Sequence, residues 1–155
     1  MSKLILQLTK ILIPIETSIG ERRVSATPET VKKLKNLGCE VYIEKSAGEL
    51  SGFKDFSYEE SGGIIFKEQD FNPWKEVDII FCINCPDHEK LTKLKEDCLI
   101  IGLLNPFGNK DLAKLLSDQK LSAIALELLP RISRAQSSDV LSSQANIAGY
   151  KSVLL

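Results

Sequence analysis

Short apolar segments rich in β-branched residues alternate with helix-like segments along almost the whole chain. This alternation is typical of βα units that build a mostly parallel sheet with helices on both faces, because a crossover between parallel strands must cover the sheet. The sequence therefore predicts an α/β fold over residues 10–128. The expected strands are residues 10–15, 39–44, 64–66, 77–83, 98–104 and 121–128.

The predicted helices are marked by capping signals and apolar spacing. Thr27 is an N-cap candidate, Pro28 suits the first helical position, and Gly38 is placed to end this helix. The residues expected on its buried face are Val31, Leu34 and Leu37. Further helices are expected at residues 58–60, 87–94, 110–116 and 137–155, and a glycine-rich loop at residues 46–52. The apolar run 77–83 predicts a strand that is buried on both faces.

The size and charge of the chain limit the classes of function. The 155 residues fit one domain, and a net charge of -1 gives no basic excess that would attract nucleic acid or anionic lipid. We therefore expect a small molecule or another protein as partner. No apolar run is long enough to cross a bilayer, and Lys3, Gln7 and Lys10 interrupt the first apolar stretch, which argues against a signal peptide.

Cysteines invite a metal or redox interpretation, with Cys82 and Cys85 in a C-x-x-C spacing and His88 and Cys98 nearby. We favour packing instead, because two of these cysteines fall in or beside apolar strands and a second C-x-x-C pair is missing. His88 is the only histidine of the chain, which leaves little material for a catalytic triad. The sequence predicts no metal site and a reducing cytoplasm.

Two regions carry candidate binding residues. Arg22 and Arg23 lie in the loop after the first strand, at the sheet edge where ligands bind, and either contact a carboxylate or phosphate or are ordinary surface arginines. Residues 130–150 place cations, an amide, a carboxylate and hydroxyls at a helix start. That helix start is either a ligand site or a helix capped by Ser137 or Ser138. No G-x-G-x-x-G turn occurs.

Residues 20–28 (GERRVSATP), followed by Leu37-Gly38 and Ala47-Gly48, resemble the opening of the alanine dehydrogenase and transhydrogenase alpha-subunit superfamily. Residues 130–136 (PRISRAQ) and 146–150 (NIAGY) resemble the signature of the NAD(H)-binding component of proton-translocating transhydrogenases. The resemblance implies a Rossmann-like (flavodoxin-like) first subdomain at residues 1–136 and the start of a connecting helix at residues 137–155. A second, NAD-binding subdomain with a glycine fingerprint is then expected beyond residue 155.

The resemblance also implies an activity and its residues: hydride transfer between NAD(H) and NADP(H), coupled to proton translocation. It assigns cofactor binding to Arg131, Gln136, Asp139 and Ser142, and catalytic roles to Gln136 and Asp139. Arg131 and Ser142 would hold the nicotinamide, Asp139 would orient the loop, and Gln136 would bridge towards the NADP(H)-bearing component. Hydride transfer needs positioned rings rather than an acid or a base, which fits these residue types.

The family also implies partners and a location. A homodimer is expected that binds NADP(H)-binding and membrane-spanning components and is cytoplasmic, peripheral to the membrane, without direct membrane insertion. Two alternatives remain, an alanine dehydrogenase-like fragment and a non-catalytic folding or dimerisation module. The first lacks the family's lysine and histidine, because Asn84 and Asn105 stand at those positions, although Arg23 matches a substrate-binding arginine.

Overall fold

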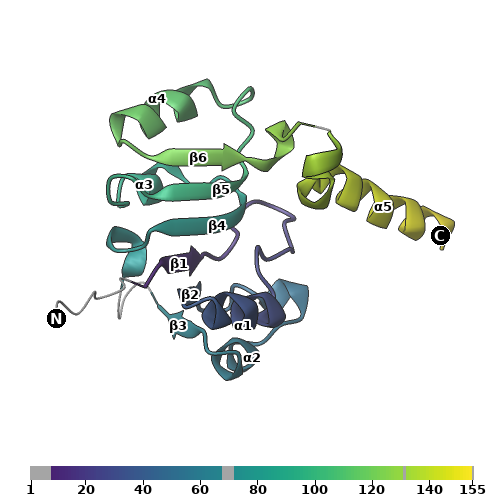
Figure 1. Ribbon diagram of the computed structural model, residues 1–155, viewed down its shortest axis with the longest axis horizontal. Helices are drawn as coiled ribbons and strands as arrows, with labels where there is room; N and C mark the ends of the chain where they lie inside the picture. The colour runs from purple at the N-terminus through teal and green to yellow at the C-terminus, as the bar shows by residue number, and fades with distance from the viewer. Residues whose placement is uncertain (1–7, 68–71, 131, 155) are drawn as a thin grey trace.

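The computed structural model describes residues 8–67, 72–130 and 132–154. Six strands form one sheet in the order β3-β2-β1-β4-β5-β6, and every pairing found among the described residues is parallel (Figure 1). The strands are β1 (Lys10–Ile13), β2 (Glu40–Glu44), β3 (Ile64–Phe66), β4 (Ile79–Asn84), β5 (Leu99–Leu103) and β6 (Ser122–Ala125). The expected mostly parallel α/β fold is confirmed.

Helices and short 3-10 segments lie between these strands and after the last one. The α-helices are α1 (Pro28–Asn36), α2 (Asp55–Glu60), α3 (His88–Leu91), α4 (Lys110–Asp118) and α5 (Val140–Val153). The 3-10 turns are η1 (Glu49–Ser51), η2 (Pro73–Lys75), η3 (Leu126–Leu128) and η4 (Ser133–Ser138). None of the helices within the described ranges is long and apolar enough to cross a membrane.

The strand order places a switch point between β1 and β4. The order 3-2-1-4-5-6 is that of doubly wound sheets, and without the short β3 the other strands follow the flavodoxin order 2-1-3-4-5. In both orders the chain reverses direction across the sheet between the central strands, and ligands bind beside their carboxyl ends. The strand order therefore favours a ligand site at the loops after β1 and β4.

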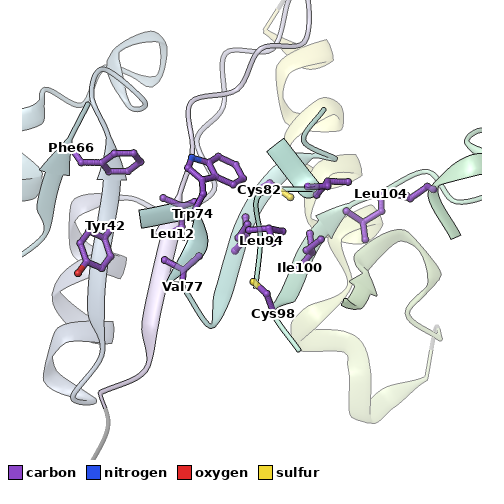
Figure 2. Close-up of a cluster of buried hydrophobic side chains, with 13 residues drawn as sticks. Leu12, Tyr42, Phe66, Trp74, Val77, Cys82, Leu94, Cys98, Ile100 and Leu104 are labelled. Carbon is purple, nitrogen blue, oxygen red and sulfur yellow. The ribbon is translucent and has the colours of Figure 1, made fainter. Parts of the chain in front are cut away.

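One face of the sheet carries the larger core. Leu12 of β1 lies there in one cluster with Trp74 of η2 (Figure 2). The same cluster includes Leu91 of α3 and Leu112 of α4, and all four side chains are at most 1% exposed. Successive strand side chains alternate between faces, so Ile13 contributes to the opposite core. The sheet is thus covered on both sides, as predicted.

The opposite face is covered less completely. There α1 and α2 contribute Val31 and Tyr58, which pack against β2. Phe81 of β4 and Ile101 of β5 point to the same face but are only half-buried. The prediction that residues 77–83 are buried on both faces is therefore wrong on this side, because the two helices lie over the other half of the sheet.

Helix α1 begins where its capping signals predict. The Thr27 Oγ1 accepts a hydrogen bond from the Thr30 N–H at 3.3 Å, and Pro28 occupies the first helical turn. Gly38 adopts φ +86°, a left-handed conformation that suits glycine after a helix. Leu37, in contrast, is 79% exposed, so its prediction as a core residue is wrong. Leu37 is the C-cap residue of α1, and at this position the side chain faces solvent instead of the sheet.

Several boundaries also differ from the predictions. The first strand stops at Ile13 because Pro14 cannot donate to a strand ladder. Residues 126–128 form η3 instead of continuing the last strand. The helix expected at residues 87–94 spans only His88–Leu91, and the loop at residues 46–52 contains the turn η1.

Candidate functional site

The loop between β1 and α1 crosses the carboxyl end of β4 at the switch point. The Glu16 carboxylate fixes it there, accepting hydrogen bonds from the backbone N–H of Ile83 at 2.6 Å and of Asn84 at 3.0 Å. The Ser25 hydroxyl donates to the Phe81 carbonyl oxygen at 2.7 Å. The pairing of β4 with β1 ends at Ile80, so on this side of β4 the loop takes the place of a neighbouring strand and is held against the sheet.

A second carboxylate in this loop organises Arg23. Glu21 accepts hydrogen bonds from Arg23 Nε at 2.8 Å and Nη2 at 2.6 Å, and from Asn84 Nδ2 at 3.1 Å. The hydrogen bonds from Arg23 and Asn84 outweigh the effect of burial and lower the pKa of Glu21 to about 2, while the same carboxylate raises the pKa of Arg23. The positive charge of Arg23 is thus balanced inside the protein.

Little space remains beside the switch point. The pocket there has a volume of about 10 Å³, room for roughly one water molecule. Its lining includes Glu16, Asn84, Asp87 and Lys90. The loop, with its Glu16 carboxylate bonded to the end of β4, therefore occupies much of the crevice in which doubly wound sheets hold their ligands.

Asn105, at the end of β5, is engaged in local structure. It has φ +47°, its backbone N–H donates to the Glu127 carboxylate, and its Oδ1 accepts from the Gly108 N–H at 3.2 Å. Asparagine tolerates this left-handed conformation better than most residues. Neither the Asn105 side-chain amide nor that of Asn84 ionises near neutral pH, so neither can act as a general acid or base.

A larger pocket lies where η4 meets α5. It has a volume of about 260 Å³ and is lined by Ile132, Ser133, Gln136, Asp139 and Ser142. Three of the four residues singled out in the sequence for cofactor binding thus come together in one open pocket. The fourth, Arg131, lies outside the described residues.

Asp139 organises the first turn of α5. Its Oδ1 accepts from the Ser142 backbone N–H at 3.1 Å, and its Oδ2 accepts from the Ser142 hydroxyl at 2.6 Å. The prediction of Ser137 or Ser138 as N-cap is wrong, because both belong to η4 and the extended backbone before the helix is that of Asp139. The sequence does contain a signal for Asp139 as N-cap, because an aspartate followed three residues later by a serine (D-x-x-S) is a short-range capping pattern.

The groups that line this pocket are mostly polar, and the Asp139 carboxylate is the charged group among the described lining residues. Because an ionised carboxylate only accepts hydrogen bonds, the Ser142 hydroxyl must donate to Asp139. The lone pairs of the Ser142 hydroxyl therefore remain available to accept a hydrogen bond from a ligand. The Gln136 amide can both donate and accept. Such groups suit a ligand amide or hydroxyl better than an anion.

No sequence pattern assigned a role to Glu16, Glu21 or Gln144, the residues that tie the switch-point loop to its surroundings. Arg23 Nη1 donates to Gln144 Oε1 of α5 at 3.4 Å, which joins two segments 121 positions apart. The only available signal for Glu21 was an acidic residue next to two arginines in a loop at the carboxyl edge. For Gln144 we find no sequence signal.

The cysteines are free thiols in the described part of the chain, and no group of three or more potential metal ligands occurs there. Cys82 and Cys98 are buried, as the packing interpretation expects. Burial raises the pKa of Cys85 and of Cys98 to about 11 and that of Cys82 further. These thiols therefore stay protonated near neutral pH.

Comparison with known proteins adds an independent line of evidence. Residues 12–148 match the family model described as "Alanine dehydrogenase/PNT, N-terminal domain". The chain is 38% identical over 142 residues to the NAD(P) transhydrogenase subunit alpha of Haemophilus influenzae, covering 92% of this chain and 27% of that protein. It is 31% identical over 141 residues to alanine dehydrogenase 1 of Staphylococcus aureus, covering 90% of this chain and 36% of that protein.

Among solved structures, the transhydrogenase from Sinorhizobium meliloti superposes with a TM-score of 0.86 at 37% identity. The match covers 94% of this chain and 43% of that one. The chain therefore spans less than half the length of the relatives that it matches.

Proposed function

Because the chain belongs to the family of alanine dehydrogenase and transhydrogenase N-terminal domains, we propose that it forms the N-terminal part of the NAD(H)-binding subunit of a transhydrogenase. The enzyme transfers hydride between NAD(H) and NADP(H) and couples the transfer to proton translocation. The observation that carries the proposal is the pocket in which Gln136, Asp139 and Ser142 meet at the start of α5.

The donor set of this pocket fits the nicotinamide end of NAD(H). A carboxamide offers N–H donors to the lone pairs of Ser142 and both a donor and an acceptor to the Gln136 amide. The pocket volume of about 260 Å³ suits a ring with its carboxamide rather than a whole dinucleotide. Pyrophosphate and adenosine then have to be held elsewhere, in agreement with the lack of a G-x-G-x-x-G turn.

The residues of the chain act by positioning. The nicotinamide ring, when bound, gives or takes the hydride. Asp139 fixes the Ser142 hydroxyl by the 2.6 Å hydrogen bond, so that its lone pairs keep one direction. Gln136, an exposed residue of the pocket lining, contacts the NADP(H)-bearing partner component, and Arg131 holds the carboxamide together with Ser142. Placement of two rings at contact distance is the main requirement for hydride transfer.

We assign residues 1–136 to a first Rossmann-like subdomain and residues 137–155 to the start of a helix that connects it to a second, NAD-binding subdomain. The greater length of the relatives supports this division. The working enzyme would be a homodimer of such subunits that binds NADP(H)-binding and membrane-spanning components. It would be located in the cytoplasm, peripheral to the membrane through those partners.

Alanine dehydrogenase activity is the second candidate, supported by the 31% identity to the enzyme from Staphylococcus aureus. Two observations speak against it. Asn84 and Asn105 occupy the positions where the resemblance expects a substrate-binding lysine and a histidine, and neither amide can accept a proton from an amino acid. Arg23 is paired with Glu21, so it is not free to receive a substrate carboxylate.

A direct experiment separates these possibilities. The chain is fused to the remainder of the Haemophilus influenzae subunit alpha, and the fusion protein is combined with the partner subunit of that enzyme. We expect NADH-dependent reduction of an NADP⁺ analogue and no alanine-dependent reduction of NAD⁺. Alanine oxidation would support the second candidate, and a folded fusion protein that binds NADH but transfers no hydride would support a purely structural module.

A further inference from the structure

Ser142 of α5 and the N-cap residue Asp139 line the proposed nicotinamide pocket, yet this helix has few contacts with the sheet. None of its described residues is buried, and it extends away from the sheet (Figure 1). The pocket needs Asp139 and Ser142 at a defined place, because misplacement by about 1 Å can slow a reaction on the order of a hundredfold. Some contact must therefore fix the first turns of this helix.

The loop after β1 provides such a contact through Arg23. Glu21 engages Nε and Nη2 of the guanidinium with its two oxygens, a paired geometry that holds the planar group in one orientation. The Glu21 side chain is only 10% exposed and is itself fixed by Asn84 Nδ2. The remaining nitrogen, Nη1, thereby points in a fixed direction, and it donates to Gln144 Oε1 at 3.4 Å.

Gln144 lies five positions after the N-cap Asp139 on the same helix. With a rise of about 1.5 Å per residue, the two are separated by only some 7 Å of rigid helix. A contact that holds Gln144 therefore also holds Asp139 and Ser142. The chain of contacts runs from the end of β4 through Asn84, Glu21 and Arg23 to α5.

We propose that Glu21 and Arg23 are positioning residues that set the place of α5, and with it of Asp139 and Ser142, relative to the sheet. The catalytic consequence rests on the proposed function, whereas the structural link does not. Arg23 acts through Gln144 and touches no substrate. Arg23 matches the arginine that binds the substrate carboxylate in alanine dehydrogenase. In this chain the proposal gives it a positioning role instead.

The structural link is tested on the 155-residue chain by amide hydrogen exchange of α5. We expect R23A and Q144A each to increase exchange in the first turns of α5 several-fold, and the double variant to exchange no faster than either single one. E21A should act like R23A, and R23K should lie between R23A and the parent, because lysine keeps the charge but cannot bridge both oxygens.

The matched control is R22A, since the Arg22 side chain forms no hydrogen bond or ion pair within the described ranges. It should leave α5 exchange unchanged, and all variants should keep protection in β1 and β4. Unchanged α5 exchange in R23A, or effects of R23A and Q144A that add in the double variant, would overturn the link.

The catalytic consequence is tested in the fusion protein described above. We expect R23A to lower kcat for hydride transfer about tenfold or more while the NADH dissociation constant changes less than about threefold, with partial rescue in R23K. If the parent fusion transfers no hydride, the proposed function fails while the exchange result still decides the link. If the parent is active and R23A is equally active, the positioning role is wrong.

Discussion

Gly102 of β5 lies so close to Cys82 of β4 that a Cβ at position 102 would come within 2.6 Å of both the carbonyl oxygen and the Sγ of Cys82. The sulfur could rotate away, but the carbonyl belongs to the sheet and cannot. We predict that Gly102→Ala destabilises the chain by about 1–3 kcal/mol, the usual cost of overpacking. Urea denaturation followed by circular dichroism measures the change.

Gly149 of α5 is the matched control. A Cβ there meets nothing within 4 Å, and the residue is in the interior of a helix. Gly149→Ala should therefore stabilise α5 by up to about 1 kcal/mol, because alanine loses less conformational freedom in a helix than glycine. Helicity should rise slightly. Equal destabilisation by both substitutions would mean that the close contact with Cys82 is not the cause.

Glu21 predicts a pH dependence of stability. Its pKa is about 2 in the folded chain, against an ordinary value of 4.5, so folding favours the charged form. The stabilisation is complete above about pH 4.5 and is lost as the pH falls towards 2. The ion pair should stabilise the folded chain by about 1–2 kcal/mol at neutral pH. The value is modest because the Arg23 side chain is 43% exposed and water screens its charge.

Comparison of the parent chain with Glu21→Gln tests this point. At pH 7 the variant should be less stable by that amount, and the difference should shrink between pH 4.5 and 3. Glu29→Gln, which removes an exposed ion pair with Lys33 within α1, serves as the control and should change little. A Glu21→Gln difference that stays constant down to pH 3 would contradict the assigned pKa.

The cysteines should bind no structural zinc. Zinc binds thiolates, and burial raises the pKa of Cys85 and Cys98 to about 11, so binding would require deprotonation of groups that strongly favour the neutral form. We expect elemental analysis of the purified chain to find zinc far below one equivalent. We also expect Cys82 and Cys98 to react with a thiol reagent only after unfolding.

The alternation of apolar and helical segments was sufficient to predict the sheet. The strand Ile64–Phe66 and the start of α1 at Pro28 agree with the sequence prediction because each depends on local signals, a short apolar run or a capped first turn. Errors occur where tertiary contacts decide. Leu37 is apolar, but it lies at the end of α1, beyond the residues of this helix that face the sheet. Residues 126–128 form η3 instead of strand, and there the Glu127 carboxylate accepts a hydrogen bond from the Asn105 N–H just after β5.

In the candidate site, too, local patterns could be predicted from the sequence and long-range contacts could not. Asp139 and Ser142 could be found from a motif of neighbouring residues, and the structure brings them into one pocket with Gln136. The link from Glu21 and Arg23 to Gln144 could not be found this way, because its partners are 121 positions apart and each is an ordinary surface residue by type. Only folding makes them neighbours.

The chain by itself should bind NADH only weakly. The pocket at α5 offers contacts to the nicotinamide end, whereas a glycine turn for pyrophosphate and the acidic residue for the adenosine ribose have no counterpart in the sequence. Each missing charge-assisted hydrogen bond is worth roughly 1.5 to 3 kcal/mol, so two or three of them separate a micromolar from a millimolar site. Calorimetric titration should therefore detect no NADH binding tighter than about millimolar.

The fusion protein should regain NADH binding, and there Gln136→Ala should slow hydride transfer much more than it weakens NADH affinity. The reason is that ring placement matters most in the transition state, while affinity arises mainly from the rest of the dinucleotide. Ser142→Ala should behave alike, whereas Ser143→Ala should have little effect, because the Ser143 hydroxyl donates to the Val140 carbonyl within α5 and the pocket lining does not include it. A dissociation constant of tens of micromolar or tighter for the chain alone would place the main source of affinity in these residues, and the proposed division of the binding site between two subdomains would then be wrong.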